Sequence, residues 1–110
     1  MVKFVAIYQT PANPEEFERR YREEHLPLGR KLPNVLGVEM LRLKKLMGGL
    51  DAYLIVTVAF ADRVAFKETA GTPEWKAWGE NAVDIAGADG ITGFLAEVEL
   101  PAGFAGAAAL

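Results

Sequence analysis

The chain has 110 residues, of which 51% are hydrophobic and 25% charged, and these values are typical of one soluble globular domain. Its net charge of −3 argues against nucleic-acid binding, which needs a basic surface. Cysteine and serine are absent and His25 is the only histidine, which excludes disulfides, serine triads and multi-histidine or thiolate metal sites. The chain has no apolar run of membrane-spanning length and no recognisable signal peptide, so we predict a cytoplasmic protein without a membrane partner.

The first predicted elements are a strand and a helix. Residues Val2–Thr10 are apolar at nearly every position, which is typical of a strand buried on both faces. Asn13 is a good N-cap and Pro14 suits the first helical position, so a helix should follow. We expect this helix to end or kink at Pro27, which has no N–H to donate. Its apolar stripe consists of three residues spaced four apart, Phe17, Tyr21 and His25.

Two further strands are predicted at Val35–Met47 and Leu50–Phe60, joined by a two-residue hairpin turn at Gly48-Gly49. Strand alternation divides the second of them into two apolar faces. One face consists of Ala52, Leu54, Val56, Val58 and Phe60, and the other of Tyr53, Ile55, Thr57 and Ala59.

The C-terminal half contains two helical segments and a last strand. Asp62 caps a short helix that ends at Gly71, and Thr72-Pro73 starts another. The apolar stripe of this second segment is Trp75, Trp78, Ala82 and Ile85. A strand at Ile91–Leu100 follows. We therefore expect one domain at residues 1–101 and a Gly/Ala-rich tail at 102–110.

This order, β-α-β-β-α-β, predicts an α+β ferredoxin-like fold, a four-stranded antiparallel sheet with helices on one face. The helices can cover only one face of the sheet, yet the first and third strands are apolar on both. The uncovered face would expose Ile7, Tyr53, Ile55 and Leu95, or the residues alternating with them. An apolar patch of that size usually marks an interface. We therefore expect a homodimer whose two sheets pack face to face.

The residues of the first half also resemble a known family. The segment Tyr8–Leu28 is similar to the opening of EthD-type proteins, in which a strand and a Pro-containing turn lead to an aromatic-rich helix ending in His-x-Pro, here His25-Leu26-Pro27. Residues Tyr53–Phe60 and Thr72–Asp84 resemble the third strand and second helix of the family. The resemblance covers about residues 2–100 and implies a dimeric α+β barrel. The wider superfamily of such barrels includes cofactor-free monooxygenases, lactone isomerases and haem proteins. For function, the resemblance is therefore an analogy at the level of the fold.

His25 is the candidate catalytic residue, because its side chain can exchange a proton near neutral pH. Tyr8 and Tyr21 are candidates to assist it, and Phe17, Tyr53 and Trp78 to bind a substrate. The competing interpretation is that these aromatic side chains only pack and that His25 merely holds the helix end on the sheet. Three carboxylates, Glu39, Glu97 and Glu99, lie in apolar strands. Any of them that pointed inward would have a raised pKa, although exposed glutamate is the usual case.

Three functions remain open from the sequence. The first is binding of a small aromatic or carbonyl-bearing molecule with cofactor-free proton transfer, as in an isomerase, dehydratase or monooxygenase. The second is a ligand-binding or structural dimer without catalysis. The third is haem binding through His25, by superfamily analogy alone. We see no nucleotide motif, because neither Gly48-Gly49 nor Gly87–Gly90 lies between a strand and a helix start, and we predict no cofactor or metal.

Overall fold

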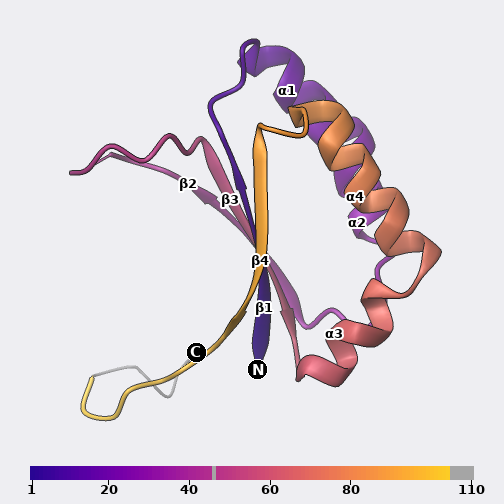
Figure 1. Ribbon diagram of the computed structural model, residues 1–110, viewed down its shortest axis with the longest axis vertical. Coiled ribbons are helices and arrows are strands. Elements are labelled where there is room, and N and C mark those ends of the chain that lie inside the picture. The colour runs from indigo at the N-terminus through magenta and orange to yellow at the C-terminus, as the bar shows by residue number, and fades with distance from the viewer. Residues whose placement is uncertain (46, 105–110) are drawn as a thin grey trace.

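The strand β1 (Val2–Tyr8) lies inside a four-stranded antiparallel sheet of order β2-β3-β1-β4 (Figure 1). The other strands are β2 (Gly37–Arg42), β3 (Leu54–Phe60) and β4 (Ile91–Glu97). The computed structural model describes residues 1–45 and 47–104. This arrangement confirms the ferredoxin-like βαββαβ fold predicted from the order of elements.

The predicted hairpin at Gly48-Gly49 is longer than a two-residue turn. The last residue pair between β2 and β3 is Arg42 with Leu54. The strand β1 ends at the same level, since its last residue, Tyr8, also pairs with Leu54. Beyond this level the two chain segments have no third strand beside them, and Figure 1 shows them extending away from the sheet. A two-stranded extension without a core is only marginally stable, which explains the shorter strands. The predicted strand position 46 lies outside the described residues.

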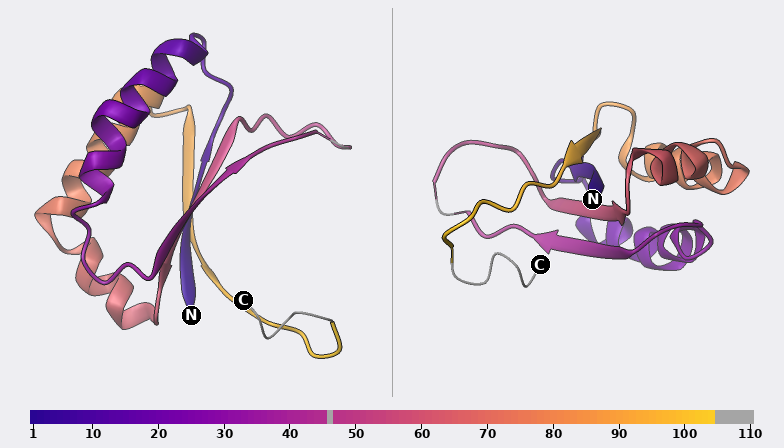
Figure 2. Two further views of the ribbon diagram at one scale, coloured as in Figure 1. Left: turned by 180° about the vertical axis from the view of Figure 1, so that it is seen from behind. Right: turned by 90° about the horizontal axis from the view of Figure 1, so that it is seen from below.

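The helical segments all lie on one face of the sheet (Figure 2). They are α1 (Pro14–Arg20), the π-helical turn η1 (Tyr21–His25), α2 (Leu26–Gly29), α3 (Arg63–Ala70) and α4 (Pro73–Ala86). The three predicted N-caps are confirmed. The side chains of Asn13, Asp62 and Thr72 accept hydrogen bonds from the backbone N–H of Glu16, Ala65 and Trp75.

We predicted that the first helix would either end or kink at Pro27, and it does not end there. The helix instead passes through the π-helical turn η1, where the Leu26 N–H bonds to the carbonyl of Tyr21, and then continues as α2. Pro27 has no N–H for the carbonyl of Glu23, and its ring would crowd that carbonyl in a regular α-helix. The wider turn directly before it accommodates both effects, and such turns are frequent at functional sites.

Strand alternation separates a covered face from an open face. The covered face contributes most of the core: Val2, Ala6, Tyr8, Leu54, Val56, Val58 and Phe60. On the open face, Ile7 lies opposite Ile55, and Val5 lies opposite Phe94. Leu41 and Phe94 are each 45% exposed there. Of the two sets of residues left open by the sequence, Ile7 and Ile55 are on the uncovered face. Leu95 instead lies opposite Phe4 and packs against the core, and Tyr53 packs against Phe17 of α1.

In the described part of the chain, no helix has the length and apolar character needed to cross a bilayer. The predicted tail begins at residue 102, and its residues 105–110 lie outside the described part. Residues up to Phe104 continue past β4 on the side of the open face (Figure 1).

Candidate active site

A buried cluster of aromatic side chains lies between the sheet and the helices, with His25 at its centre. His25 is 1% exposed, and its Nε2 atom lies 3.3 Å from the hydroxyl oxygen of Tyr8. Its ring stacks on the Trp78 indole, with the centroids 5.0 Å apart at an interplanar angle of 20°. The Tyr21 ring lies 4.9 Å away on another side. Side chains from β1, η1 and α4 thus enclose the only histidine.

The π-helical turn keeps the predicted stripe on the buried side. Residues four apart in an α-helix differ by about 40° in direction, so three such residues would drift by about 80°. The wider turn after Tyr21 counters the second step of this drift. Phe17, Tyr21 and His25 are accordingly all buried, at 4%, 2% and 1% exposure.

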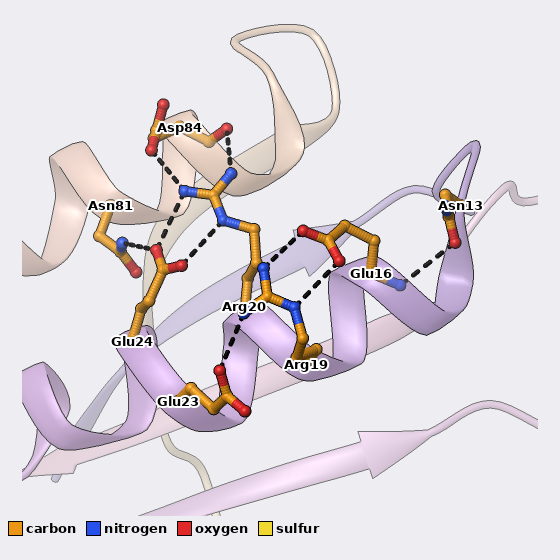
Figure 3. Close-up of polar contacts among 8 residues, drawn as sticks. All are labelled: Asn13, Glu16, Arg19, Arg20, Glu23, Glu24, Asn81 and Asp84. Atoms are coloured by element: carbon orange, nitrogen blue, oxygen red, sulfur yellow. Dashed lines mark hydrogen bonds and ion pairs between the residues drawn. The ribbon is translucent and has the colours of Figure 1, made fainter.

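The second ring nitrogen of His25 also has a partner. Its Nδ1 atom lies 3.0 Å from Oδ1 of Asn81, and Nδ2 of Asn81 donates to Oε1 of Glu24 at 3.1 Å. Glu24 in turn accepts two hydrogen bonds from Arg20, which also donates to Asp84 at 2.6 Å (Figure 3). A line of polar contacts therefore runs from the buried histidine to the surface between α1 and α4.

Burial determines the protonation of the cluster. It lowers the pKa of His25, with the Asn81 contact acting in the opposite direction, so the imidazole is neutral at neutral pH. Burial, together with Tyr21, raises the pKa of Tyr8 well above its ordinary value. Burial also raises the pKa of Tyr21 to about 12. Both hydroxyl groups therefore keep their protons at neutral pH and can donate hydrogen bonds.

Two apolar cavities adjoin the cluster, and the Trp78 indole forms part of the wall of both. The larger one, of about 390 Å³, lies against Tyr21 and the strands β2 and β3. The smaller one, of about 250 Å³, lies against Tyr8, β1 and β4. Gly29 lets the indole approach closely, because a Cβ there would lie 3.1 Å from its Nε1 atom. A more polar cleft of about 500 Å³ at the β1–α1 and α4–β4 loops has none of Tyr8, His25 and Trp78 in its wall.

The structure brings together four of the six predicted site residues. Tyr8, Tyr21 and His25 contact one another, and Trp78 stacks on His25. Phe17 packs behind Tyr8 at a centroid distance of 5.4 Å and lines the polar cleft rather than the apolar cavities.

Tyr53 is separate from the other predicted residues. It precedes β3, and its hydroxyl donates to Glu18 at 2.6 Å while the Arg42 guanidinium lies 5.8 Å from its ring centroid. Glu18 also accepts two hydrogen bonds from Arg42. The Tyr53 side chain therefore belongs to a polar contact between α1 and the end of β2. Its ring contacts Phe17, and its backbone N–H donates to the carbonyl of Tyr8 at 2.7 Å.

Sequence reasoning missed Asn81 and misjudged Glu24. Asn81 follows Trp78 by three residues and so lies on the same face of α4, which was the available signal. Arg20 and Glu24 lie in a mostly charged run, Glu18–Glu24, that is typical of a solvated helix face, yet they connect the first helix to α4 through Asp84 and Asn81. Glu39 lies on the open face, where hydrogen bonds from Thr57 and Lys3 lower its pKa, the opposite of the shift expected for an inward carboxylate.

His25 is not arranged as a haem ligand. Both ring nitrogens are engaged, by Tyr8 and Asn81, and the side chain is enclosed. An iron would need one of those nitrogens free, so the residues present do not fit that group. Within residues 1–45 and 47–104, no three His, Asp or Glu side chains are grouped as metal ligands.

The chain is similar to several solved structures. An ethyl tert-butyl ether D (EthD) family protein from Bacillus halodurans C-125 is 30% identical, with a TM-score of 0.83 over 90% of this chain and 99% of that one. A dimeric ferredoxin-like protein of unknown function from Jannaschia sp. CCS1 is 19% identical, with a TM-score of 0.69 over 89% and 100%. A point variant of SnoaB, a cofactor-independent oxygenase from Streptomyces nogalater, is 17% identical, with a TM-score of 0.66 over 92% and 95%. Neither a protein-family model nor a curated protein matches the sequence.

Proposed function

The chain belongs to the EthD family, and we propose that it binds a small aromatic or carbonyl-bearing molecule and transfers a proton on it without a cofactor. One observation carries this proposal: the buried hydrogen bond between Tyr8 and His25, beside an apolar cavity whose wall includes Tyr8. A neutral imidazole is the strongest base in the cluster at neutral pH, and its access to the cavity runs through the Tyr8 hydroxyl.

The cavities favour a small apolar ligand with one or two polar atoms. Their walls are mostly aliphatic and aromatic. Tyr21 offers a hydroxyl donor to the larger cavity, whereas Tyr8 donates its proton to His25 and offers the smaller cavity an acceptor oxygen. Tyr8 would meet a ligand in the smaller cavity, Tyr21 one in the larger cavity, and Trp78 a ligand in either. A carbonyl oxygen is a matching acceptor for the Tyr21 hydroxyl, and an acidic C–H or a phenolic O–H is a matching donor for the Tyr8 oxygen.

The proton passes through Tyr8 rather than leaving a tyrosinate behind. A carbon or oxygen acid of the substrate gives its proton to the Tyr8 oxygen as the Tyr8 proton moves to Nε2 of His25. The products of this step are a substrate anion and an imidazolium ion. The raised pKa of Tyr8 disfavours a separate phenolate, and the lowered pKa of His25 favours return of the proton to another substrate atom. That return completes an isomerisation.

The likeness to SnoaB supports the chemical class, because that protein is described as a cofactor-independent oxygenase on the same fold. A substrate anion is also the species that can react with dioxygen when no cofactor is present. Our proposal therefore covers the first step of the reaction, which is removal of a proton from the substrate.

Exchange of hydrogen with deuterium tests this first step without the natural substrate. We would incubate the protein with 1-tetralone in D₂O and follow deuterium at the carbon next to the carbonyl by NMR. The expected result is exchange faster than in buffer, with Tyr8→Phe and His25→Gln reducing the enzymatic rate by about 10²-fold or more. Phe17→Leu, which changes the packing behind Tyr8 but no polar group, is the matched control.

The alternative is a ligand-binding protein without catalysis, and the same samples distinguish it. Binding of the ketone should change the tryptophan fluorescence, because Trp78 lines both cavities and Trp75 lines the smaller one. Ketone binding with exchange no faster than in buffer would favour the alternative. Exchange that is equally fast in the wild type and in His25→Gln would mean that His25 takes no part in the proton transfer.

We also propose that two copies of the chain pair through the open faces of their sheets. The apolar side chains there, including Leu41 and Phe94, need a cover, and similar structures are described as dimeric. Native mass spectrometry should find a species of about twice the 12.0 kDa chain mass. A monomer at micromolar concentration would contradict this pairing.

A further inference from the structure

We propose that Glu24 and Asn81 are positioning residues that hold His25 in the tautomer with its proton on Nδ1 and its lone pair on Nε2. The inference rests on the proposed function of the Tyr8–His25 pair, because only this tautomer lets Nε2 accept the Tyr8 proton. It assigns a role to a line of contacts that begins at a surface carboxylate and ends at the buried imidazole.

The line begins at Glu24, which can only accept hydrogen bonds. Arg20 donates from Nε to Oε2 and from Nη2 to Oε1 of Glu24, both at 3.0 Å. This paired contact lowers the pKa of Glu24, so the carboxylate is ionised at neutral pH. Asp84 on α4 holds the same guanidinium at 2.6 Å (Figure 3). An ionised carboxylate has no proton to donate to its next neighbour.

The acceptor at Glu24 determines which way the Asn81 amide points. Only the NH₂ end of the amide can bond to a carboxylate, and Nδ2 lies 3.1 Å from Oε1 of Glu24. The amide oxygen is thereby directed at His25, with Oδ1 at 3.0 Å from Nδ1. The opposite orientation would place two acceptors against each other at Glu24.

The amide oxygen in turn determines the imidazole. Oδ1 is an acceptor, so Nδ1 must carry the proton, and in the neutral ring Nε2 is then the acceptor. Nε2 lies 3.3 Å from the Tyr8 hydroxyl, which donates to it. The other groups around the ring, Tyr21 and Trp78, carry no charge at neutral pH. Every hydrogen bond in the line therefore has one direction, from Tyr8 toward the surface carboxylate.

The single histidine makes the tautomer directly measurable. Protein labelled with ¹⁵N-histidine gives one pair of ring nitrogen signals, and their chemical shifts distinguish a protonated from an unprotonated nitrogen. In the ligand-free wild type we expect a protonated Nδ1 and an unprotonated Nε2. Asn81→Leu removes the acceptor, so a substantial fraction of molecules should shift to a protonated Nε2.

Glu24→Gln is the sharper variant, since it keeps the size of the side chain and replaces an obligate acceptor with an amide. Both directions of the line then become available, and a mixed tautomer is expected. Glu23→Gln is the matched control: Glu23 is the adjacent carboxylate, pairs with Arg19 and should leave the tautomer unchanged. Circular dichroism verifies that each variant is folded, and the half-buried Glu24 position keeps the test valid if Asn81→Leu does not fold.

The outcomes separate this inference from the proposed function. A wild-type ring protonated at Nε2, or a tautomer that neither variant changes, would overturn the positioning role even if deuterium exchange is catalysed. The expected tautomer, its loss in Glu24→Gln and at least a tenfold lower exchange rate in that variant would support it. If the wild type has the expected tautomer but catalyses no exchange, these contacts have no role in catalysis, and the proposed function is wrong as well.

Discussion

The two faces of the sheet contain similar side chains in very different surroundings. On the covered face, Leu54, Val56 and Val58 are at most 1% exposed beneath the helices. On the open face, Leu41 and Phe94 are each 45% exposed, and Lys3, Glu39 and Thr57 form a polar contact among them. The covered face therefore holds the core and the candidate site within one chain, whereas the open face needs a partner to be buried. Internal packing and association depend on alternate residues of the same strands.

The largest predicted effect is on the covered face. Trp78→Ala removes an indole that packs on His25, Phe4 and Trp75, and replacement of a buried tryptophan by alanine costs about 3–5 kcal/mol. Phe94→Ala on the open face should cost less per chain. Urea unfolding at one protein concentration measures both variants. An equal loss of unfolding free energy in the two variants would mean that the covered face does not contribute more to the stability of one chain than the open face.

The next largest effect is on association. Phe94→Asp places a charge on the open face, where pairing of two sheets would bury it without a partner. We expect the dimer dissociation constant to rise by about 100-fold or more, with the circular dichroism spectrum of the folded chain retained. Sedimentation at several concentrations measures the constant, and Val64→Asp, exposed on α3, serves as the control. An unchanged constant would place the interface elsewhere.

A smaller effect concerns pH and the buried histidine. Burial lowers the pKa of His25 below its ordinary value of 6.5, so the unfolded state takes up a proton more readily than the folded state does. The stabilising contribution is complete above about pH 6.5 and declines as the pH falls toward the lowered pKa. The decline has a limiting slope of about 1.4 kcal/mol per pH unit. His25→Gln should lack this decline. Urea titrations from pH 7.5 to 5 compare the two, and parallel curves would contradict the assignment.

The smallest effect belongs to the ion pair of the open face. Lys3 lies 3.0 Å from Glu39, with side chains 32% and 56% exposed, and such pairs contribute about 0.2–1 kcal/mol. Lys3→Met should therefore change the free energy of unfolding by less than about 1 kcal/mol, and added salt should reduce the difference. Thermal melts at low and high salt measure it. A much larger loss would indicate that the pair is buried between two copies.

The fold was predictable because local signals and the hydrophobic pattern agree. Asn13, Asp62 and Thr72 mark helix starts by their capping chemistry, and the period of two in β3 defines two faces. The lengths of β2 and β3 were not predictable in the same way. Gly48-Gly49 favours a tight turn, but the pairing ends where β1 ends, and that limit depends on a strand distant in the sequence.

The candidate site was predictable only in part. Phe17, Tyr21 and His25 follow a spacing, so their shared buried face could be inferred from sequence. The contact of His25 with Asn81 spans 56 positions, and the contact of Asn81 with Glu24 spans 57. No periodicity relates residues so far apart, because the packing angle between two helices determines which polar side chains meet.

The π-helical turn η1 divides the first helix into two segments of different rotational phase. A turn closed on the fifth preceding carbonyl holds one residue more than an α turn, and one residue corresponds to about 100° around an α-helix. The faces of α1 and α2 are therefore offset by that angle, and a helical wheel drawn with one period misplaces every residue from Leu26 onward. A one-residue deletion between Tyr21 and His25 would restore a common phase, but it would also remove the spacing that brings the histidine to Tyr8.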